Sequence, residues 1–472
     1  MERIVIVGAG ISGLATAFRL QQRLPNAEIT VLEASPRPGG TLWTERKSGF
    51  QFEAGANGFL NHRSSTLRLC HDLGISQDLI AANPIAKKRF LYYMDELYEM
   101  PQSFWQWLRT PLLSWRSKWR LLTERFRSKL DSQEEESVFD FAKRRVSEDV
   151  ADLFADAMVT GIYAGDSKQL SLPAAFPRVA LAEKAFGNVS KGLPKVLAHE
   201  RQQQGLPAGP LAPQLMSFKP GMRMLVEILM HRLKKKPLLG VPVRTLQLDR
   251  TQDSRPIWTV DADGTDLIQA DAVILTCPAP RQAALVADVD PELSDLIAHI
   301  PYVPVVVVAL GYRRSDVLMP TEGFGYLAPY KDRRMLLGVQ YCSSIFPERA
   351  PDDCILLRAM CGGWHRREIM TMDDDKLSSA VRYELRMTLG TIRPPVFMQI
   401  IRWDPAIPQY TLGHLDRVAA IEMQAARHPG LFLGGNAYHG VSLNDCTEQA
   451  ELMADRLSTY FHASPSASIP EQ

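Results

Sequence analysis

Short apolar runs and a helical pattern alternate at the start of the chain. A glycine-rich turn separates the apolar run Ile4–Val7 from a helix expected to begin near Leu14. A second apolar run, Ile29–Leu32, ends at Glu33. Short buried runs on either side of a helical segment are typical of a βαβ unit in a parallel sheet. The first segment of the chain therefore predicts such a unit.

A similar pattern returns near the other end. Leu431–Leu433 is an apolar run, Gly434–Gly440 is punctuated by glycines, and the following residues are apolar at helical spacing as far as Tyr460. This spacing predicts a strand, a loop and a helix. Asp445 is the expected N-cap of that helix, with Glu448 three residues further on.

The middle of the chain changes character twice. Residues 104–220 are expected to be mainly helical, with a Gly- and Pro-rich loop at 205–213. Over residues 302–402, apolar and β-branched runs such as Val303–Leu310 and Met335–Val339 alternate with turn residues. That alternation predicts an antiparallel sheet. Further strands around a turn are expected at 240–243 and 270–278.

Composition restricts the class of protein. The chain has 472 residues, of which 46% are apolar and 23% charged, and its net charge is +1. These values are typical of a soluble globular protein with two or three domains and a core large enough for a sizeable cofactor. Because the net charge is close to zero, no general attraction to nucleic acid is expected.

Cysteine and histidine spacing predicts neither disulfides nor a metal site. The six cysteines include no C-x-x-C pair and the ten histidines show no metal-ligand spacing. A reducing compartment is the simplest interpretation. The sequence opens on a strand without a signal-like segment and has no membrane-spanning apolar run, so we expect cytoplasmic residence. Residues 463–472 are rich in Ser and Pro and are expected to be disordered.

The glycine-rich turn, residues 8–13, has the G-x-G-x-x-G spacing of a dinucleotide site. Gly8 suits a tight turn, Gly10 a close approach of a pyrophosphate to the backbone, and Gly13 tight packing of the helix on the strand. The helix N-terminus then faces the phosphates, and Glu33 is placed to accept ribose hydroxyls. The spacing leaves open which dinucleotide binds.

The residues after Glu33 favour FAD. Residues 33–40 resemble the E-x-x-x-R-x-G-G extension of the amine-oxidase-type FAD superfamily, which nicotinamide dehydrogenases lack. Arg37 can reach the pyrophosphate, and Gly39 and Gly40 let the backbone pass close to the cofactor. The alternative is a surface turn rich in Pro and Gly. No attachment residue is identified, so the FAD is expected to be noncovalent. The predicted cofactor contacts are Gly8, Gly10, Ile11, Ser12, Gly13, Glu33, Ala34, Arg37, Gly40, Thr41, Val243, Gly435, Asn436 and Val441.

This resemblance implies an α/β fold with a discontinuous, Rossmann-like FAD-binding domain. Its segments are expected at residues 1–57, 221–290 and 392–460, with residues 271–278 returning beside the adenosine and the C-terminal helix starting at the flavin. An α+β substrate-binding domain is expected at 58–103 and 291–391. Residues 104–220 are expected to form a helical, membrane-type insertion.

Residues 101–130 form an unusual patch, with seven basic residues, one acid and four of the eight tryptophans. Two interpretations stay open. Basic helices with interfacial aromatic residues lie on anionic membrane surfaces, whereas the same pattern also suits a solvated face over a tryptophan-containing core. The first makes a membrane surface a candidate partner and predicts a peripheral position on the cytoplasmic membrane face.

Several segments outside the FAD motif are similar to one family, the oxygen-dependent protoporphyrinogen oxidases of haem biosynthesis. Monoamine, polyamine and carotenoid oxidases share the N-terminal motif but not these segments, which are Phe52–Phe59, Lys88–Phe90, Thr160–Asp166, Gly323–Leu327, Phe346–Ala350 and Gly435–Tyr438. The resemblance implies a six-electron oxidation of a porphyrinogen in three FAD-mediated hydride transfers, with oxygen as acceptor and hydrogen peroxide as product. Ferrochelatase or another haem-pathway enzyme is a further candidate partner.

The resemblance also implies roles for individual residues. Arg89 would bind a substrate propionate, because a guanidinium group pairs with a carboxylate in a bidentate way. Leu327 and Met360 would flank the macrocycle, and Asn57 and the backbone of Gly161 would lie near the flavin and the reacting edge. Arg89, Gly161 and Asn57 are therefore the predicted catalytic residues. Gln340 departs from the family pattern, which has an apolar residue there, and Ala56–Gly58 replaces the commoner Pro-Asn-Ser/Thr.

Three other functions stay open. A similar FAD protein oxidises coproporphyrinogen III to coproporphyrin III, and its extra carboxylates would favour additional basic residues in the pocket. An amine or polyene oxidoreductase would share only the FAD fold. A non-catalytic flavin-binding partner in a haem-pathway complex is the third alternative.

Overall fold

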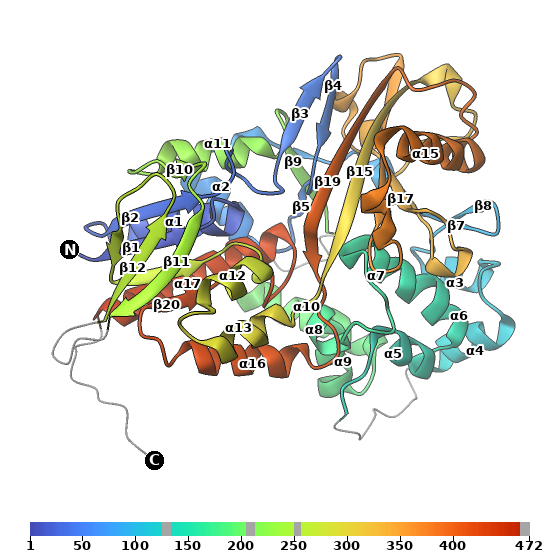
Figure 1. The fold of residues 1–472 in the computed structure, drawn as a ribbon. Coiled ribbons are helices and arrows are strands. Elements are labelled where there is room, and N and C mark those ends of the chain that lie inside the picture. Colours follow the sequence, from blue (N-terminus) through green and yellow to red (C-terminus); the bar gives the residue numbers. More distant parts are fainter. Residues whose placement is uncertain (125–133, 204–212, 250–255, 463–472) are drawn as a thin grey trace.

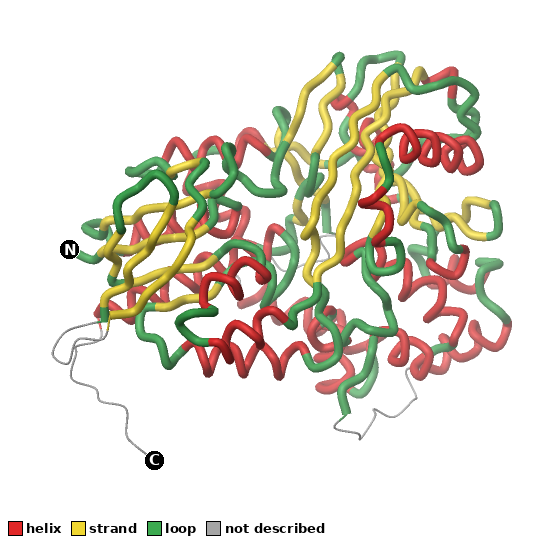
Figure 2. Tube along the Cα trace, viewed as in Figure 1, coloured by secondary structure: helices red, strands yellow, loops and turns green. Residues whose placement is uncertain are grey.

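The computed structural model describes residues 1–124, 134–203, 213–249 and 256–462. The chain folds into two halves that lie side by side (Figure 1). The half that contains the N-terminus and residues 443–462 is built on a parallel sheet, and the other half holds a larger sheet with a group of helices beneath it. Figure 2 shows the strands gathered in these two regions, with helices around them.

The first sheet has five parallel strands, in the order β10 (Leu238–Leu239), β2 (Glu28–Glu33), β1 (Arg3–Val7), β14 (Ala272–Leu275) and β20 (Leu431–Leu433). It is buried on both faces, as parallel sheets are. Alternate residues of β1 enter two different cores, Ile4 and Ile6 on one face and Val5 and Val7 on the other. The strands come from the beginning, the middle and the end of the chain.

Helices cover one face of this sheet, and a small antiparallel sheet with further helices covers the other. The first layer consists of α1 (Ile11–Arg23), α2 (Ser64–Leu73), α11 (Arg223–Arg232) and α17 (Leu443–His462). The second consists of β11 (Val243–Asp249), β12 (Ile257–Ala262), β13 (Ile268–Ala270), α12 (Ala279–Val286), α13 (Pro291–Ala298) and α16 (His414–Ala425). The βαβ unit expected at the start of the chain is confirmed.

Two helix starts differ from the sequence predictions. Helix α1 begins at Ile11 rather than near Leu14, with Gly10 in an extended conformation before it. Helix α17 begins at Leu443, so the prediction that Asp445 caps it is wrong. Ser442 Oγ accepts a hydrogen bond from Asp445 N at 3.2 Å, and the Asp445 carboxylate accepts one from Ser442 N at 3.0 Å. Asp445 therefore lies inside the first turn, as the second member of a capping box.

The second sheet has seven strands, and the sheet expected over residues 302–402 forms most of it. Its order is β19 (Phe397–Pro408), β15 (Tyr302–Arg313), β18 (Cys354–Gly362), β17 (Leu336–Tyr341), β16 (Gly325–Leu327), β7 (Phe90–Tyr93) and β8 (Glu96–Glu99). All neighbours are antiparallel except β16 and β7. Helix α15 (Asp374–Leu389) packs on one face, and α14 (Cys342–Ile345) follows β17.

The predicted domain boundaries need three adjustments. Helices α2 and α13 pack on the parallel sheet, although they fall in the predicted substrate-binding ranges 58–103 and 291–391. Strand β19 pairs with β15 along its length, so residues 397–408 belong to the seven-stranded sheet although they fall in the predicted FAD segment 392–460. Two smaller sheets join the halves: β3 (Thr44–Lys47) with β4 (Phe50–Glu53), and β9 (Leu215–Phe218) between β5 (Phe59–Leu60) and β6 (Leu79–Ala81). The remaining boundaries stay predictions.

The described residues between 104 and 203 are mainly helical, as expected, with short loops between the helices. The predicted helical stretch also includes a strand near its end, β9. The helices are α3 (Phe104–Arg109), α4 (Trp115–Thr123), α5 (Val138–Arg145), α6 (Glu148–Val150), α7 (Asp156–Tyr163), α8 (Leu172–Ala175), α9 (Pro177–Phe186) and α10 (Val189–Gln203). Within the described ranges no helix is both long and apolar enough to cross a bilayer. The predicted tail at 463–472, nearly all of the loop at 205–213 and residues 125–130 of the basic patch lie outside the described residues.

Candidate active site

The glycine turn at the carboxyl end of β1 has three glycines with three different surroundings. Gly8 has a φ of +111°, and a Cβ there would approach Thr276 Oγ1 to 2.9 Å. A Cβ on Gly13 would lie 1.9 Å from the Gly8 carbonyl oxygen, so only glycine lets α1 pack on β1. A Cβ on Gly10 would meet no protein atom within 4 Å. Gly10 thus faces open space, as the approach of a pyrophosphate requires.

The end of β2 lies next to this turn. The Glu33 carboxylate accepts hydrogen bonds from Ala9 N at 2.7 Å and Ser35 N at 2.9 Å, which fix it beside the turn. The first helical hydrogen bond of α1 runs from Leu14 N to Gly10 O. The amides of Ile11 and Ser12 precede that bond and are available to an anion.

The R-x-G-G segment runs along the glycine turn. Gly39 N donates to Ala9 O at 2.7 Å, and Gly39 and Gly40 have φ values of +95° and +57°. Arg37 Nη1 donates to Gly40 O at 2.9 Å, and the guanidinium lies over the Trp43 ring at 4.6 Å. Burial lowers the pKa of Arg37. This arrangement is a loop folded against the nucleotide site rather than a free surface turn.

The end of β20 adds another wall at the same edge of the sheet. Gln282 Nε2 donates to Cys277 O at 2.6 Å and to Gly434 O at 2.9 Å, which ties the ends of β14 and β20 together. Gly435 follows with a φ of +99°. Because all these strands are parallel, their carboxyl ends meet at one edge, where doubly wound sheets bind ligands.

The other predicted cofactor residues occupy varied positions. Ala34 follows β2 directly, Thr41 follows Gly40 and is exposed, and Val243 is buried at the start of β11. Val441 is half-buried and packs on the core around α7. Together with the glycine turn and Glu33 these residues fit a dinucleotide with its pyrophosphate at α1. No group of three potential metal ligands occurs in the described parts of the chain.

A cavity of about 870 Å³ lies between the group of helices and the seven-stranded sheet. Five of the six predicted substrate and catalytic residues line it: Arg89, Gly161, Leu327, Gln340 and Met360. They come from the loop before β7 and from α7, β16, β17 and β18. A Cβ on Gly161 would lie 3.0 Å from Leu327 Cδ1, so glycine lets the helix approach the sheet here. The volume suits a large organic ligand.

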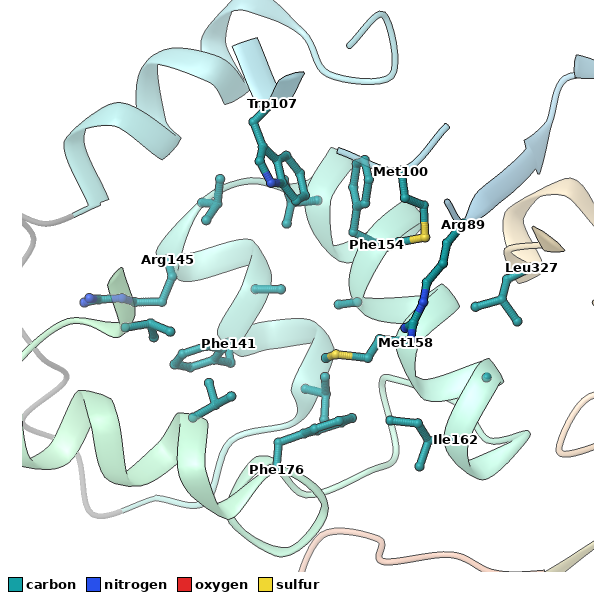
Figure 3. Close-up of a pocket in the computed structure, with 18 of the residues that line it drawn as sticks. Arg89, Met100, Trp107, Phe141, Arg145, Phe154, Met158, Ile162, Phe176 and Leu327 are labelled. Carbon is teal, nitrogen blue, oxygen red and sulfur yellow. The ribbon is translucent and has the colours of Figure 1, made fainter. Parts of the chain in front are cut away.

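Arg89 is the cation at the sheet side of the cavity. Its guanidinium lies 4.9 Å from the centre of the Phe324 ring, and in the described chain it makes no ion pair. Figure 3 shows the side chain directed toward Met158, on the opposite wall. The side chain is exposed because the cavity is open, yet desolvation by the surrounding protein still lowers its pKa. It carries the charge that a carboxylate would neutralise.

Asn57 does not line this cavity. Its side chain is buried, and in the described residues its Nδ2 has no hydrogen-bond partner. The preceding backbone is held from the seven-stranded sheet, because Arg358 Nη1 donates to Gly55 O at 2.6 Å and Trp403 Nε1 donates to Ala54 O at 2.8 Å. Gln340 Oε1 is likewise buried without a partner in the described chain. Both amides have capacity left for a ligand.

Sequence reasoning missed most of the cavity wall. The helices supply apolar side chains, among them Phe141, Phe154, Met158, Ile162 and Phe176 (Figure 3). Of the apolar side chains, Trp107 belongs to the basic patch and Ile162 to the segment Thr160–Asp166 that resembles the family. An ion pair between Arg145 and Glu124 lines the cavity as well, and Arg145 is directed away from Met158. No local pattern distinguishes these residues from ordinary helix core.

Comparisons with known proteins agree with this geometry. The family model described as flavin containing amine oxidoreductase matches residues 11–458. The chloroplastic protoporphyrinogen oxidase of Oryza sativa subsp. japonica is 30% identical over 97% of this chain and 88% of its own length. The coproporphyrinogen III oxidase of Bacillus subtilis (strain 168) is 27% identical, covering 97% and 98%.

Solved structures show the same fold. A protein from Exiguobacterium sp. 255-15, provisionally named a protoporphyrinogen oxidase, superposes with a TM-score of 0.81 at 24% identity and covers 97% of this chain and 98% of its own. Wild-type putrescine oxidase bound to putrescine superposes with a TM-score of 0.69 at 16% identity, with coverage of 97% and 98%. The fold is therefore shared by oxidases of different substrates, and the cavity has to indicate which substrate this chain takes.

Proposed function

The chain belongs to the flavin-containing amine oxidoreductase family as an FAD-dependent oxidase, and from this premise we propose that it oxidises protoporphyrinogen IX to protoporphyrin IX. The relatives act on two porphyrinogens by name, protoporphyrinogen and coproporphyrinogen III. The substrates differ in their carboxylates: protoporphyrinogen IX has two on one edge and apolar vinyl groups elsewhere, whereas coproporphyrinogen III has four.

The distribution of charge in the cavity favours one of these two substrates. The lining contains two cations in the described chain, Arg89 and Arg145. Arg145 is paired with Glu124 and with Glu183, the latter at 3.2 Å, so its charge is already neutralised. Arg89 is left to meet a carboxylate, and the remaining wall is mostly apolar or aromatic, with Gln340 and Ser190 as its neutral polar side chains. One available cation and a broad apolar wall favour the substrate with fewer carboxylates.

The residues of the cavity then position the macrocycle. Arg89 binds a propionate, Leu327 and Met360 contact the ring system, and Gly161 leaves space for its reacting edge. Gln340 Oε1 accepts a hydrogen bond from a pyrrole N–H. Bound FAD would supply the hydride acceptor for each of three rounds, with oxygen taking the two electrons, the hydride hydrogen and the proton released by the substrate as hydrogen peroxide. The protein contributes orientation and exclusion of water.

The discriminating experiment is an anaerobic assay with each porphyrinogen in turn, following the loss of flavin absorbance. We expect kcat/KM for flavin reduction to be at least tenfold higher with protoporphyrinogen IX than with coproporphyrinogen III. The reverse order would replace the proposal by coproporphyrinogen oxidation. If neither compound reduces the flavin while an amine or polyene does, the porphyrinogen assignment is wrong.

We also propose that α3 and α4 bind an anionic membrane surface, which keeps the protein peripheral to the cytoplasmic membrane face. Trp105, Trp115 and Trp119 are 67%, 83% and 68% exposed, far more than tryptophan in a core. Arg116 and Arg120, exposed on the same helix α4, add positive charge. Indole rings suit the headgroup level and basic side chains suit anionic lipids.

Vesicle sedimentation checks this surface. Vesicles of phosphatidylglycerol and phosphatidylcholine should retain the protein at low salt and less of it at high salt. Replacing Trp105, Trp115 and Trp119 by glutamine should lower the bound fraction at least fivefold. Leu267→Gln is the matched control, because Leu267 is 64% exposed but lies between β12 and β13. Absence of sedimentation at either salt concentration would contradict the proposal.

A further inference from the structure

Tyr410 lies where three parts of the molecule meet. It follows β19, precedes α16 and is 1% exposed. Its ring is stacked on that of His414, with centroids 4.1 Å apart and an interplanar angle of 16°. On another side the ring of Tyr163, the last residue of α7, lies at 5.7 Å. Burial at such a site removes water from the hydroxyl, which costs free energy unless the hydroxyl is hydrogen-bonded to the protein.

The hydroxyl of Tyr410 bridges the loop that follows β20. It donates to Asn436 O at 2.7 Å and accepts from Gly440 N at 2.7 Å. Burial raises the pKa of Tyr410 well above its ordinary value, so the donor proton is retained. Gly435 and Gly440, at the ends of this loop, both have a φ of +99°. The hydroxyl therefore joins Asn436, near the start of the loop, to Gly440 at its end.

The stacked histidine supports the same loop. Its Nε2 lies 3.1 Å from Tyr438 O, and because a carbonyl only accepts, Nε2 carries the proton. Burial lowers the pKa of His414 to about 4, so the ring is neutral at neutral pH. Tyr410 and His414 thus hold the loop together with Gln282, which binds Gly434 O and the hydroxyl of Tyr438.

Tyr410 also connects this loop to the wall of the substrate cavity. Gln409 Nε2 donates to Tyr163 O at 2.8 Å, which fixes the end of α7 to the Gln409–Tyr410 segment. Helix α7 carries Gly161 and Ile162, both of which line the cavity. A short path of contacts therefore runs from the cavity through Tyr163 and Tyr410 to Asn436, a predicted cofactor contact.

We propose that Tyr410 is a positioning residue that sets the Gly435–Gly440 loop, and with it the flavin, relative to the substrate cavity. The inference rests on the proposed function for the identity of the substrate. The predicted effect of Tyr410 on FAD binding is independent of which substrate the protein oxidises, because the loop lies at the edge of the parallel sheet where the FAD is expected. Tyr410 itself touches neither the cavity nor the glycine turn in the described structure.

Tyr410→Phe tests the inference, because it removes one hydroxyl and keeps the stacked ring. We expect FAD to dissociate at least tenfold more readily and the flavin absorption bands to shift. At saturating porphyrinogen, flavin reduction should be at least tenfold slower while KM changes less than threefold. Tyr341→Phe is the matched control, since Tyr341 is equally buried and its hydroxyl has no hydrogen-bond partner in the described chain. It should stay within twofold of the wild type in every measurement.

A second variant covers the case in which Tyr410→Phe does not fold. Tyr163→Leu leaves both hydrogen bonds of Tyr410 but removes the ring beside it, and a tenfold slower flavin reduction is expected with a smaller loss of FAD affinity. The inference is overturned if Tyr410→Phe, or Tyr163→Leu where Tyr410→Phe does not fold, matches the wild type in FAD affinity, flavin spectrum and reduction rate. If no porphyrinogen reduces even the wild type, the proposed function fails, and FAD affinity and the flavin spectrum still decide the role of Tyr410.

Discussion

Replacing Arg89 by methionine should lower kcat/KM for protoporphyrinogen IX about 100-fold, equivalent to about 3 kcal/mol of transition-state binding. Methionine keeps most of the side-chain volume but removes the cation that would meet a propionate. Loss of one partner leaves the carboxylate uncompensated in a mostly apolar cavity, and such losses cost about 2–5 kcal/mol. Because the propionate lies away from the reacting centre, most of the effect should appear in KM. Steady-state porphyrin fluorescence measures both constants.

Two neighbouring variants make the Arg89 test specific. Arg89→Lys retains the charge without the planar fork, so it should recover part of the lost activity and no more. Lys87→Met removes a nearby exposed charge outside the cavity lining and should leave kcat/KM within twofold of the wild type. An Arg89→Met enzyme with an unchanged KM would show that another residue binds the carboxylate.

The nucleotide site was predictable from the sequence because its rules are local. Gly8 and Gly13 have the surroundings that their spacing in the motif predicts, and β2 ends at Glu33 beside the turn as expected. The packing of Gly13 on Gly8 and the hydrogen bond from Ala9 N to Glu33 lie within one βαβ unit, whereas Gly8 also packs against Thr276, which follows β14. The sequence therefore predicted the surroundings of Gly8 and Gly13, and the role of Gly10 stays a prediction.

The substrate cavity was predictable only in part, because its wall comes from elements far apart in the chain. Arg89, Leu327 and Met360 could be named through the family resemblance, whereas Phe141 and Phe176 look like ordinary helix core in the sequence. Periodicity shows which face of a helix is apolar, but not whether that face meets another helix or a cavity. The role inferred for Tyr410 was not predictable from the sequence for the same reason, because the hydrogen-bond partners of its hydroxyl lie more than 25 positions away in the chain.

The helix starts show a second limit. Ser442 and Asp445 are both good capping residues, and their spacing suits either as the first residue of the helix. The two hydrogen bonds between Ser442 and Asp445, which only the structure shows, identify Ser442 as the capping residue. Such ambiguity moves an element boundary by a few residues without changing the fold. Noncovalent attachment of FAD and an association with ferrochelatase stay predictions from the sequence.

Substitution of Gly10 in the glycine turn should have the second large effect, because it should weaken cofactor binding without disturbing the fold. Gly10→Ala should weaken FAD binding at least 100-fold while the unfolding midpoint of the FAD-free protein changes little. The backbone at Gly10 has a φ of −70°, which alanine adopts without strain, and the new Cβ meets no protein atom within 4 Å. The methyl group instead enters the space into which the pyrophosphate must come.

Gly13→Ala is the contrasting variant for Gly10→Ala, because its Cβ would overlap the Gly8 carbonyl at 1.9 Å. It should destabilise the FAD-free protein as well as abolish binding. FAD titration followed by protein fluorescence, together with thermal unfolding of each protein without cofactor, separates the two effects. Normal FAD affinity in Gly10→Ala would mean that the pyrophosphate does not approach this glycine. Selective loss of affinity, with the fold intact, would instead place the phosphates at the N-terminus of α1, where the helix dipole and the amides of Ile11 and Ser12 can bind them.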